Sequence, residues 1–182
     1  LVSFDGHIRA LASWDPAQPK SQVNLALEPY SPGSTVKPLL AVLYYLGEGH
    51  FPTGKSLCRK YARGRQVCYA AHGWVSWDQS LVISCSAPWR EHVPDLPALF
   101  WSTRLSNLLT ADPEGLVNPP PQLTRADWTL DELRSLPLGE PIAASPLSVA
   151  VAYAAIFNGG RLYQPTLVDE IAGRPVAAAL RD

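Results

Sequence analysis

Ser34 and Lys37 are the residues with the clearest capacity for chemistry, and they stand three positions apart in Ser-Thr-Val-Lys. A serine hydroxyl is a weak nucleophile until a neighbouring base activates it. If a helix begins at Ser34, Lys37 lies one turn further on and shares its face. Burial beneath residues such as Leu39 would lower the pKa of the amine towards neutrality. The spacing therefore predicts a nucleophile and its base, although a serine cap beside a solvated lysine gives the same tetrapeptide.

The segment around this pair has the signals of a loop followed by a helix. Residues 31–34 read Ser-Pro-Gly-Ser, and the apolar run 39–46 follows them. Gly47 and Gly49 come directly after that run and are typical of a helix end. We therefore expect a sharp entry that exposes Ser34, and then a buried helix that carries Lys37.

Capping signals place further helices along the chain. Ser76 and Gln79 have the spacing of a capping box, which predicts a helix from Ser76 to about residues 86–88. Ser145, followed by proline, and the Asn-Gly-Gly of 158–160 predict a helix over 146–157. The other expected elements are a hairpin over 2–14, a loop over 112–122, a short polar helix over 129–136 and a strand over 161–171. Strands at both ends with helices between them predict an α+β, or mixed α/β, fold.

Composition narrows the class of protein. Of the 182 residues, 47% are hydrophobic and 17% are charged, and the net charge is -1. This core-forming composition excludes a disordered chain and offers no bulk charge for nucleic acid. No apolar run reaches the ~18 residues of a membrane span. The chain has no methionine and begins at Leu1, so we expect a signal, an anchor or another domain to precede it in its parent protein.

The cysteines and histidines fit none of the usual metal-ligand spacings, so we expect neither a metal nor a cofactor. Cys58 and Cys68 could close a small disulfide loop if the protein is exported. Unpaired thiols in a reducing compartment are an equal alternative. Cys85 lies in an apolar segment and is expected to be a buried thiol. The histidines, expected to be structural or exposed, are His7, His50, His72 and His92.

Residues 49–56 contain a different candidate motif, because they fit the phosphate-binding pattern G-x4-G-K-S letter for letter. That pattern binds phosphate only between a buried strand and a helix that begins at Lys55. The preceding run begins with Lys37-Pro38, which is more typical of a helix. We therefore interpret residues 49–56 as a surface loop, and keep nucleotide binding as a third and less favoured function.

Several blocks of the sequence, in the order of the family, resemble the transpeptidase domain of penicillin-binding proteins. The family has a strand with a G-x-I-x-A-x-x-S pattern, a nucleophile motif P-G-S-T-x-K-P, a second motif Ser-x-Asn, and a long helix and strand before its third motif. The matching residues here are 5–13 with Asn24 and Ala26, then 31–38, 72–76 with 80–86, and 144–160 with 165–168.

This resemblance implies a helical subdomain packed on an antiparallel sheet, as in the DD-transpeptidase and β-lactamase fold, in an exported protein of the periplasm or cell surface. Ser34 matches the acylated nucleophile and Lys37 matches its base. Ser84 matches the second-motif serine, which passes a proton between the base and the leaving amine. Ser86 occupies the substrate-binding asparagine position. The implied partners are peptidoglycan stem peptides ending in D-alanyl-D-alanine, or β-lactams that mimic them, with no nucleic acid and with membrane contact only through a missing N-terminal anchor.

Two departures from the family pattern bear on activity. A serine at position 86 is shorter than asparagine and cannot offer a donor and an acceptor to a substrate amide at once. The third motif, Lys-Thr-Gly, does not occur, and Ala172-Gly173-Arg174-Pro175 is its nearest late counterpart. We therefore expect residues 1–182 to be one penicillin-binding-protein-like domain, incomplete at its C-terminal end. The leading function is a serine transpeptidase or carboxypeptidase, and the alternative is an inactive relative that binds an envelope partner.

Overall fold

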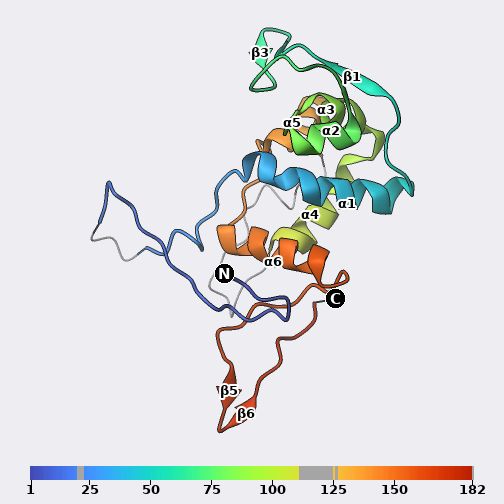
Figure 1. The fold of residues 1–182 in the computed structure, drawn as a ribbon. Coiled ribbons are helices and arrows are strands. Elements are labelled where there is room, and N and C mark those ends of the chain that lie inside the picture. The colour runs from blue at the N-terminus through green and yellow to red at the C-terminus, as the bar shows by residue number, and fades with distance from the viewer. Residues whose placement is uncertain (20–22, 111–124, 126, 182) are drawn as a thin grey trace. The chain divides into compact units, whose positions relative to one another are not determined.

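A computed structural model describes residues 1–19, 23–110, 125 and 127–181 (Figure 1). The helices and the two-stranded antiparallel sheets of this part of the chain make the fold α+β, which confirms the predicted class. The chain forms two compact units. One contains the described residues of 1–30, 105–121 and 144–182, and the other contains those of 31–104 and 122–143. The loop predicted over 112–122 lies outside the described residues.

The helix expected after Ser34 is present, but it begins in two steps. A 3-10 turn, η1 (Gly33–Val36), leads directly into helix α1 (Lys37–Glu48). Pro38 is tolerated here because the N–H groups of the first helical turn have no intrahelical partner. The helix ends at Gly49, whose φ of 75° places it in the left-handed region that glycine adopts freely.

The predicted capping box at Ser76 is also present. It opens helix α2 (Trp77–Val82), with the Ser76 and Gln79 side chains each bonding the other's backbone. The helix is shorter than expected, because it ends at Val82 and a separate helix, α3 (Ala87–His92), begins five residues later. The connection between them contains Ser84, which has a positive φ of 53°. A continuous helix cannot pass through a residue in that conformation.

Small sheets precede these helices. Strand β1 (Lys55–Cys58) pairs with β4 (Gly73–Ser76) in antiparallel register, with Cys58 opposite Gly73. Strands β2 (Tyr61–Ala62) and β3 (Arg65–Gln66) form a hairpin between them.

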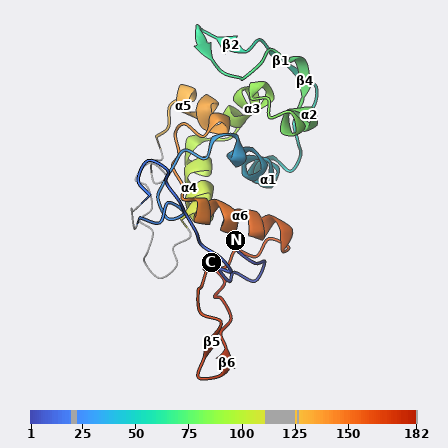
Figure 2. The ribbon, with the colours of Figure 1, turned by 60° about the vertical axis from the view of Figure 1, so that its left-hand side comes forward.

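The remaining helices of this unit complete its core. They are η2 (Val93–Asp95), the first part of α4 (Ala98–Leu109), α5 (Leu130–Ser135) and η4 (Leu136–Leu138). Helices α2, α3 and α5 lie together beside α1 (Figures 1 and 2). Trp89 and Trp101 are fully buried, and the indole of Trp89 lies against Trp77 with ring centroids 4.0 Å apart. Tyr44 of α1 packs against Trp77 with ring centroids 5.2 Å apart, so this aromatic cluster contacts α1 directly.

The other unit is built on helix α6 (Pro146–Phe157), whose bounds agree with the prediction, and the Ser145 hydroxyl caps it by accepting from Ser148 N–H. The strand predicted over 161–171 is wrong in extent. Only β5 (Glu170–Ile171) is a strand there, and it forms a short hairpin with β6 (Arg174–Pro175). The hairpin predicted over 2–14 is reduced to one antiparallel bridge between Val2 and Ile8.

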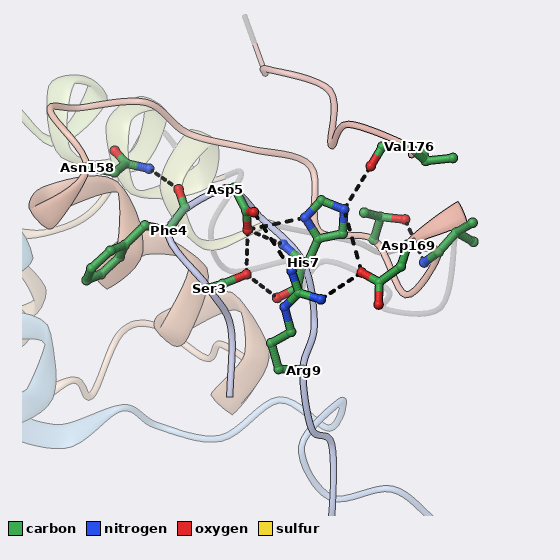
Figure 3. A network of polar contacts seen from close by, with 10 residues as sticks. Ser3, Phe4, Asp5, His7, Arg9, Asn158, Asp169 and Val176 are labelled. Atoms are coloured by element: carbon green, nitrogen blue, oxygen red, sulfur yellow. Dashed lines mark hydrogen bonds and ion pairs between the residues drawn. The ribbon is translucent and has the colours of Figure 1, made fainter. Parts of the chain in front are cut away.

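A polar network around His7 ties the two ends of this unit together (Figure 3). His7 Nε2 bonds the Val176 carbonyl at 2.8 Å, and its Nδ1 lies 3.2 Å from Asp5. Arg9 donates to Asp169 at 2.8 Å. The bond to Val176 and then the Asp5 carboxylate raise the pKa of His7. The imidazole is buried and engaged with its neighbours, as the prediction of a structural histidine requires.

Candidate functional site

The structure brings Ser34 and Lys37 into direct contact. A 3-10 helix has three residues per turn, so side chains three positions apart lie above one another. In η1 and the start of α1 this geometry places Lys37 Nζ 2.7 Å from Ser34 Oγ, where the ammonium donates to the hydroxyl. Ser34 is exposed, whereas Lys37 is only 2% exposed. A reachable hydroxyl therefore lies on a buried amine.

Ser84 is the second partner of the same amine. Lys37 Nζ donates to the Ser84 carbonyl at 3.0 Å and to the Ser84 hydroxyl at 3.3 Å. The left-handed backbone of Ser84, rare for a residue with a side chain, allows both oxygens to contact one nitrogen. Three residues from two separate segments thus share one nitrogen at the centre, and all three lie within one compact unit.

Burial tunes the amine for proton transfer. The loss of solvent around Lys37 lowers its pKa to about 8, and the nearby Cys68 and Cys85 oppose this shift only in part. A lysine with an ordinary pKa is almost entirely charged at neutral pH and cannot accept a proton. With a pKa near 8, a useful fraction of Lys37 is a free base that can take the Ser34 proton across the same short contact.

Gly139, which belongs to none of the sequence motifs, supports the loop that carries Ser34. It ends η4 with a φ of 74°, and its carbonyl accepts from the Ser31 hydroxyl at 2.8 Å. A Cβ at this position would lie 2.9 Å from the Gly33 Cα, which is closer than carbon atoms approach. The sequence signal was present as a glycine directly after an apolar helix end, but nothing in the sequence connects it with residue 33.

Ser86 does not join the group around Lys37. It is 2% exposed and is the residue before helix α3, where its carbonyl accepts from the Arg90 N–H. Among the described residues, the contacts that connect Ser34, Lys37 and Ser84 do not include it. The Ser86 side chain makes no capping hydrogen bond to α3, so Ser86 supports the helix through this carbonyl.

The nearest counterpart of the third motif has a different structure from a long strand. Ala172 and Gly173 form the turn of the β5–β6 hairpin, with φ values of 51° and 74°. Both short strands are exposed. This segment is therefore a surface hairpin.

The phosphate-loop alternative is wrong in its structural context. A helix, α1, precedes residues 49–56, and a strand, β1, begins at Lys55. A phosphate-binding loop needs the opposite order, because the backbone amides at a helix N-terminus hold the phosphate. The sequence pattern is matched here without the geometry that binds nucleotides.

A large open pocket lies away from Lys37. Its volume is about 780 Å³, and hairpin β2–β3 and helices α3 and α5 line it. None of Ser34, Lys37 and Ser84 contributes to its lining.

Metal-ligating side chains do converge in this unit, although their spacing predicted no metal set. Cys58, Cys68, His72 and Cys85 place four potential ligand atoms within 4.8 Å of one another. The three cysteines are free thiols in the structure, and all are buried. The spacing rule missed them because it describes ligands close together in the sequence. These four lie in strand β1, in the connection between β3 and β4, and in the turn after α2.

Comparison with solved structures identifies the fold. A chain of a peptidoglycan synthase complex that coordinates polymerization and crosslinking is 26% identical, with a TM-score of 0.68 over 91% of this chain and 32% of that one. PBP2 of Pseudomonas aeruginosa in complex with WCK 5153 is 23% identical, with a TM-score of 0.67 over 88% of this chain and 41% of that one. Penicillin-binding protein A of M. tuberculosis, as its imipenem acyl-enzyme, is 22% identical, with a TM-score of 0.61 over 92% of this chain and 42% of that one.

The chain therefore has the fold of the transpeptidase-type domain of penicillin-binding proteins, and the resemblance indicated by its motifs is confirmed. It spans about a third to two fifths of the length of these structures. No family model and no curated protein matches the sequence. Within the described residues, no helix is long and apolar enough to cross a bilayer.

Proposed function

We propose that this chain carries the acylation centre of a serine transpeptidase or carboxypeptidase that acts on peptidoglycan stem peptides. The observation that supports this most directly is the position of Lys37 Nζ, 2.7 Å from the Ser34 hydroxyl and 3.3 Å from the Ser84 hydroxyl. One amine can then receive a proton from the nucleophile and return it through a second hydroxyl. Such a relay is what acyl transfer by serine requires.

The reaction begins with attack of Ser34 Oγ on the carbonyl carbon of the penultimate D-alanine, while Lys37 Nζ takes the hydroxyl proton. The proton then passes through the Ser84 hydroxyl to the amide nitrogen, the C–N bond breaks, and the terminal D-alanine leaves. Ser34 is left as an ester. Water or an acceptor amine then attacks this ester and releases Ser34 with its proton restored. A β-lactam would follow the same first step, with its ring nitrogen as the tethered leaving group.

The proposed setting follows from the substrate. Peptidoglycan lies outside the cytoplasmic membrane, so the protein would be exported and would act at the periplasmic or outer cell surface. Residues 1–182 would be a single penicillin-binding-protein-like domain whose remaining strands lie in its parent protein. The acyl-enzyme of M. tuberculosis penicillin-binding protein A, which has the same fold, supports the proposed chemistry by analogy.

A second candidate is an inactive relative that binds an envelope partner. The burial of Ser86 favours it, because the second-motif position that would contact the substrate is withdrawn from solvent. The two candidates differ in one measurable property, which is covalent reaction with a β-lactam.

Incubation with a penicillin followed by intact-mass measurement tests the proposal. We expect one adduct with the mass of the drug on the wild-type protein and none on Ser34→Ala. Ser34 is exposed, and alanine there loses the hydrogen bond from Lys37 Nζ without opening a cavity, so the variant should remain folded. An adduct that persists in Ser34→Ala would exclude this nucleophile. A folded wild-type protein without an adduct would favour the inactive relative.

The pH dependence of acylation is a further expected result. Because Lys37 must be neutral to accept a proton and its pKa is lowered to about 8, the acylation rate should rise with pH and level off above about 8. Below that pH the rate should fall by about tenfold for each pH unit, as the free base is depleted. Intact-mass measurements on samples quenched at successive times, repeated at several pH values, give the acylation rate as a function of pH. A rate that stays constant through this range would contradict a lysine base.

A further inference from the structure

The open pocket beside hairpin β2–β3 gathers positive charge at a distance from the acylation centre. Strand β1, the hairpin, α3 and α5 form it within one compact unit (Figure 1). Six basic and three acidic side chains line it, although the whole chain has a net charge of -1. The pocket therefore suits an anionic ligand. The basic residues are Lys55, Arg59, Arg63, Arg65, Arg90 and Arg134.

The acidic side chains of the lining compensate only half of these cations. Ion pairs of 3.5–4.0 Å join Arg65 to Glu140, and Arg63 and Arg134 to Asp131. Within the described ranges, no carboxylate lies within 4.0 Å of the charged groups of Lys55, Arg59 or Arg90. Three cations of the pocket are thus available to a ligand.

Arg90 is the most constrained of the three. It is half-buried on α3, and its guanidinium donates to the Arg134 carbonyl at 2.8 Å, which fixes it against α5. The loss of solvent, and then the charge of Arg134, lower the pKa of Arg90. A partly buried cation beside another cation is unfavourable unless an anion pairs with it. Carboxylates pair with the planar guanidinium group through two parallel hydrogen bonds.

Strand β1 contributes an unpaired edge to the pocket. Its sheet has two strands, so in the described part of the chain β1 pairs with β4 alone. Ser56 is buried on the face towards α3, whereas Lys55 and Leu57 are exposed on the other face, and all three line the pocket. A pocket that touches both faces of a strand follows its edge. An unpaired edge presents N–H and C=O groups to which another strand can bond.

Exposed aromatic side chains favour a protein ligand over a phosphate or sugar polymer. Trp74 and Tyr61 both line the pocket, and they are 65% and 54% exposed. Trp74 lies opposite Leu57 in the β1–β4 register, so the two form an apolar step beside the edge. Tryptophan, tyrosine and arginine are the residue types that contribute most to binding at protein interfaces.

We propose that this pocket binds an extended, carboxylate-bearing peptide segment of a partner protein as an additional strand along the free edge of β1. Main-chain hydrogen bonds to β1 would supply affinity, and alternate side chains of the segment would supply specificity. Acidic side chains on one face of the segment meet Arg90 and Arg134, and apolar ones on the other face meet Leu57 and Trp74. The site does not depend on whether Ser34 is acylated.

Selection from a display library tests the pocket on the 182-residue protein itself. The probe is a library of random peptides of about ten residues, the length of a long strand. We expect the enriched peptides to be acidic, and to bind Arg59→Glu at least about tenfold more weakly than the wild type, because like charges then meet at the edge of β1. Fluorescence anisotropy of labelled peptides gives the dissociation constants, and circular dichroism checks the fold of the variant.

A matched variant separates the pocket from bulk charge. Arg104→Glu makes the same change of charge at an exposed position of α4 that does not line the pocket, so it should bind the peptides like the wild type. Equal weakening in both variants would overturn the proposal. So would a selection in which no enriched peptide is both acidic and sensitive to Arg59→Glu.

N-methylated peptides test the strand geometry. In a strand only every second amide faces the neighbouring strand. Of two versions of one enriched peptide, methylated at odd or at even amides, we therefore expect one to lose binding and the other to keep it. Equal affinities of the two versions would contradict an added strand. Inorganic polyphosphate that binds as tightly as the peptides, with the same loss in Arg59→Glu, would overturn the proposal in favour of anionic polymers.

Discussion

Replacement of Lys37 by alanine should lower the rate of acylation by a penicillin by about 10³-fold or more while leaving the protein folded. General-base catalysis contributes ~10²–10⁴-fold, and Lys37 Nζ is the nitrogen that contacts Ser34 Oγ in the structure. Burial of a charged amine is unfavourable for folding, so its removal should cost little stability. Time courses of adduct formation by intact mass, with circular dichroism as the check on folding, measure both effects.

Two further variants make this test specific. Lys37→Arg keeps the positive charge but cannot supply a free base, because arginine stays protonated, so it should be as slow as alanine. Lys55→Ala removes an exposed lysine from the start of β1 and should acylate at the wild-type rate. If Lys37→Arg retained most of the rate, the role of residue 37 would be electrostatic and the base would have to be another group.

The second large effect is expected at Gly139. Gly139→Ala should destabilise the protein by roughly 2–4 kcal/mol and slow acylation. A side chain at its φ of 74° costs about 1 kcal/mol. The added methyl group also meets the backbone of Gly33, beside the nucleophile, and overpacking of this kind costs roughly 1–3 kcal/mol more. Denaturant unfolding and the acylation rate report the two consequences separately.

Gly49 provides the matched control. It also ends a helix, with a φ of 75°, but a Cβ there meets nothing within 4 Å. Gly49→Ala should therefore show only the backbone cost of about 1 kcal/mol and leave acylation unchanged. Equal losses of stability in the two variants would mean that the contact between Gly139 and Gly33 does not support the nucleophile loop.

The sequence was most informative where chemistry depends on local spacing. Ser34 and Lys37 lie three residues apart, so the geometry of one helical turn was enough to predict their contact. The capping box at Ser76 likewise predicted a helix start that the structure contains. Each of these features is determined by atoms within a few residues of one another along the chain.

Features that depend on distant residues were missed or misjudged. The contact of Lys37 with Ser84 joins residues 47 positions apart, and only the resemblance to a known family indicated it. The cysteine and histidine group needs the β1–β4 register, which no spacing rule contains. Residues 161–171 were overpredicted as a strand, because apolar residues there do not show whether a partner strand pairs with them. Residue 166, for instance, makes only one isolated bridge, to His7.

The backbone of Ser84 places two demands on one position. Its left-handed conformation favours glycine or asparagine over serine, and strain of this kind costs on the order of 1–3 kcal/mol. A glycine would relieve the strain but would remove the hydroxyl that faces Lys37. Selection for stability and selection for activity therefore act in opposite directions here. In relatives that no longer carry out acylation, residue 84 should be among the first positions at which serine is replaced.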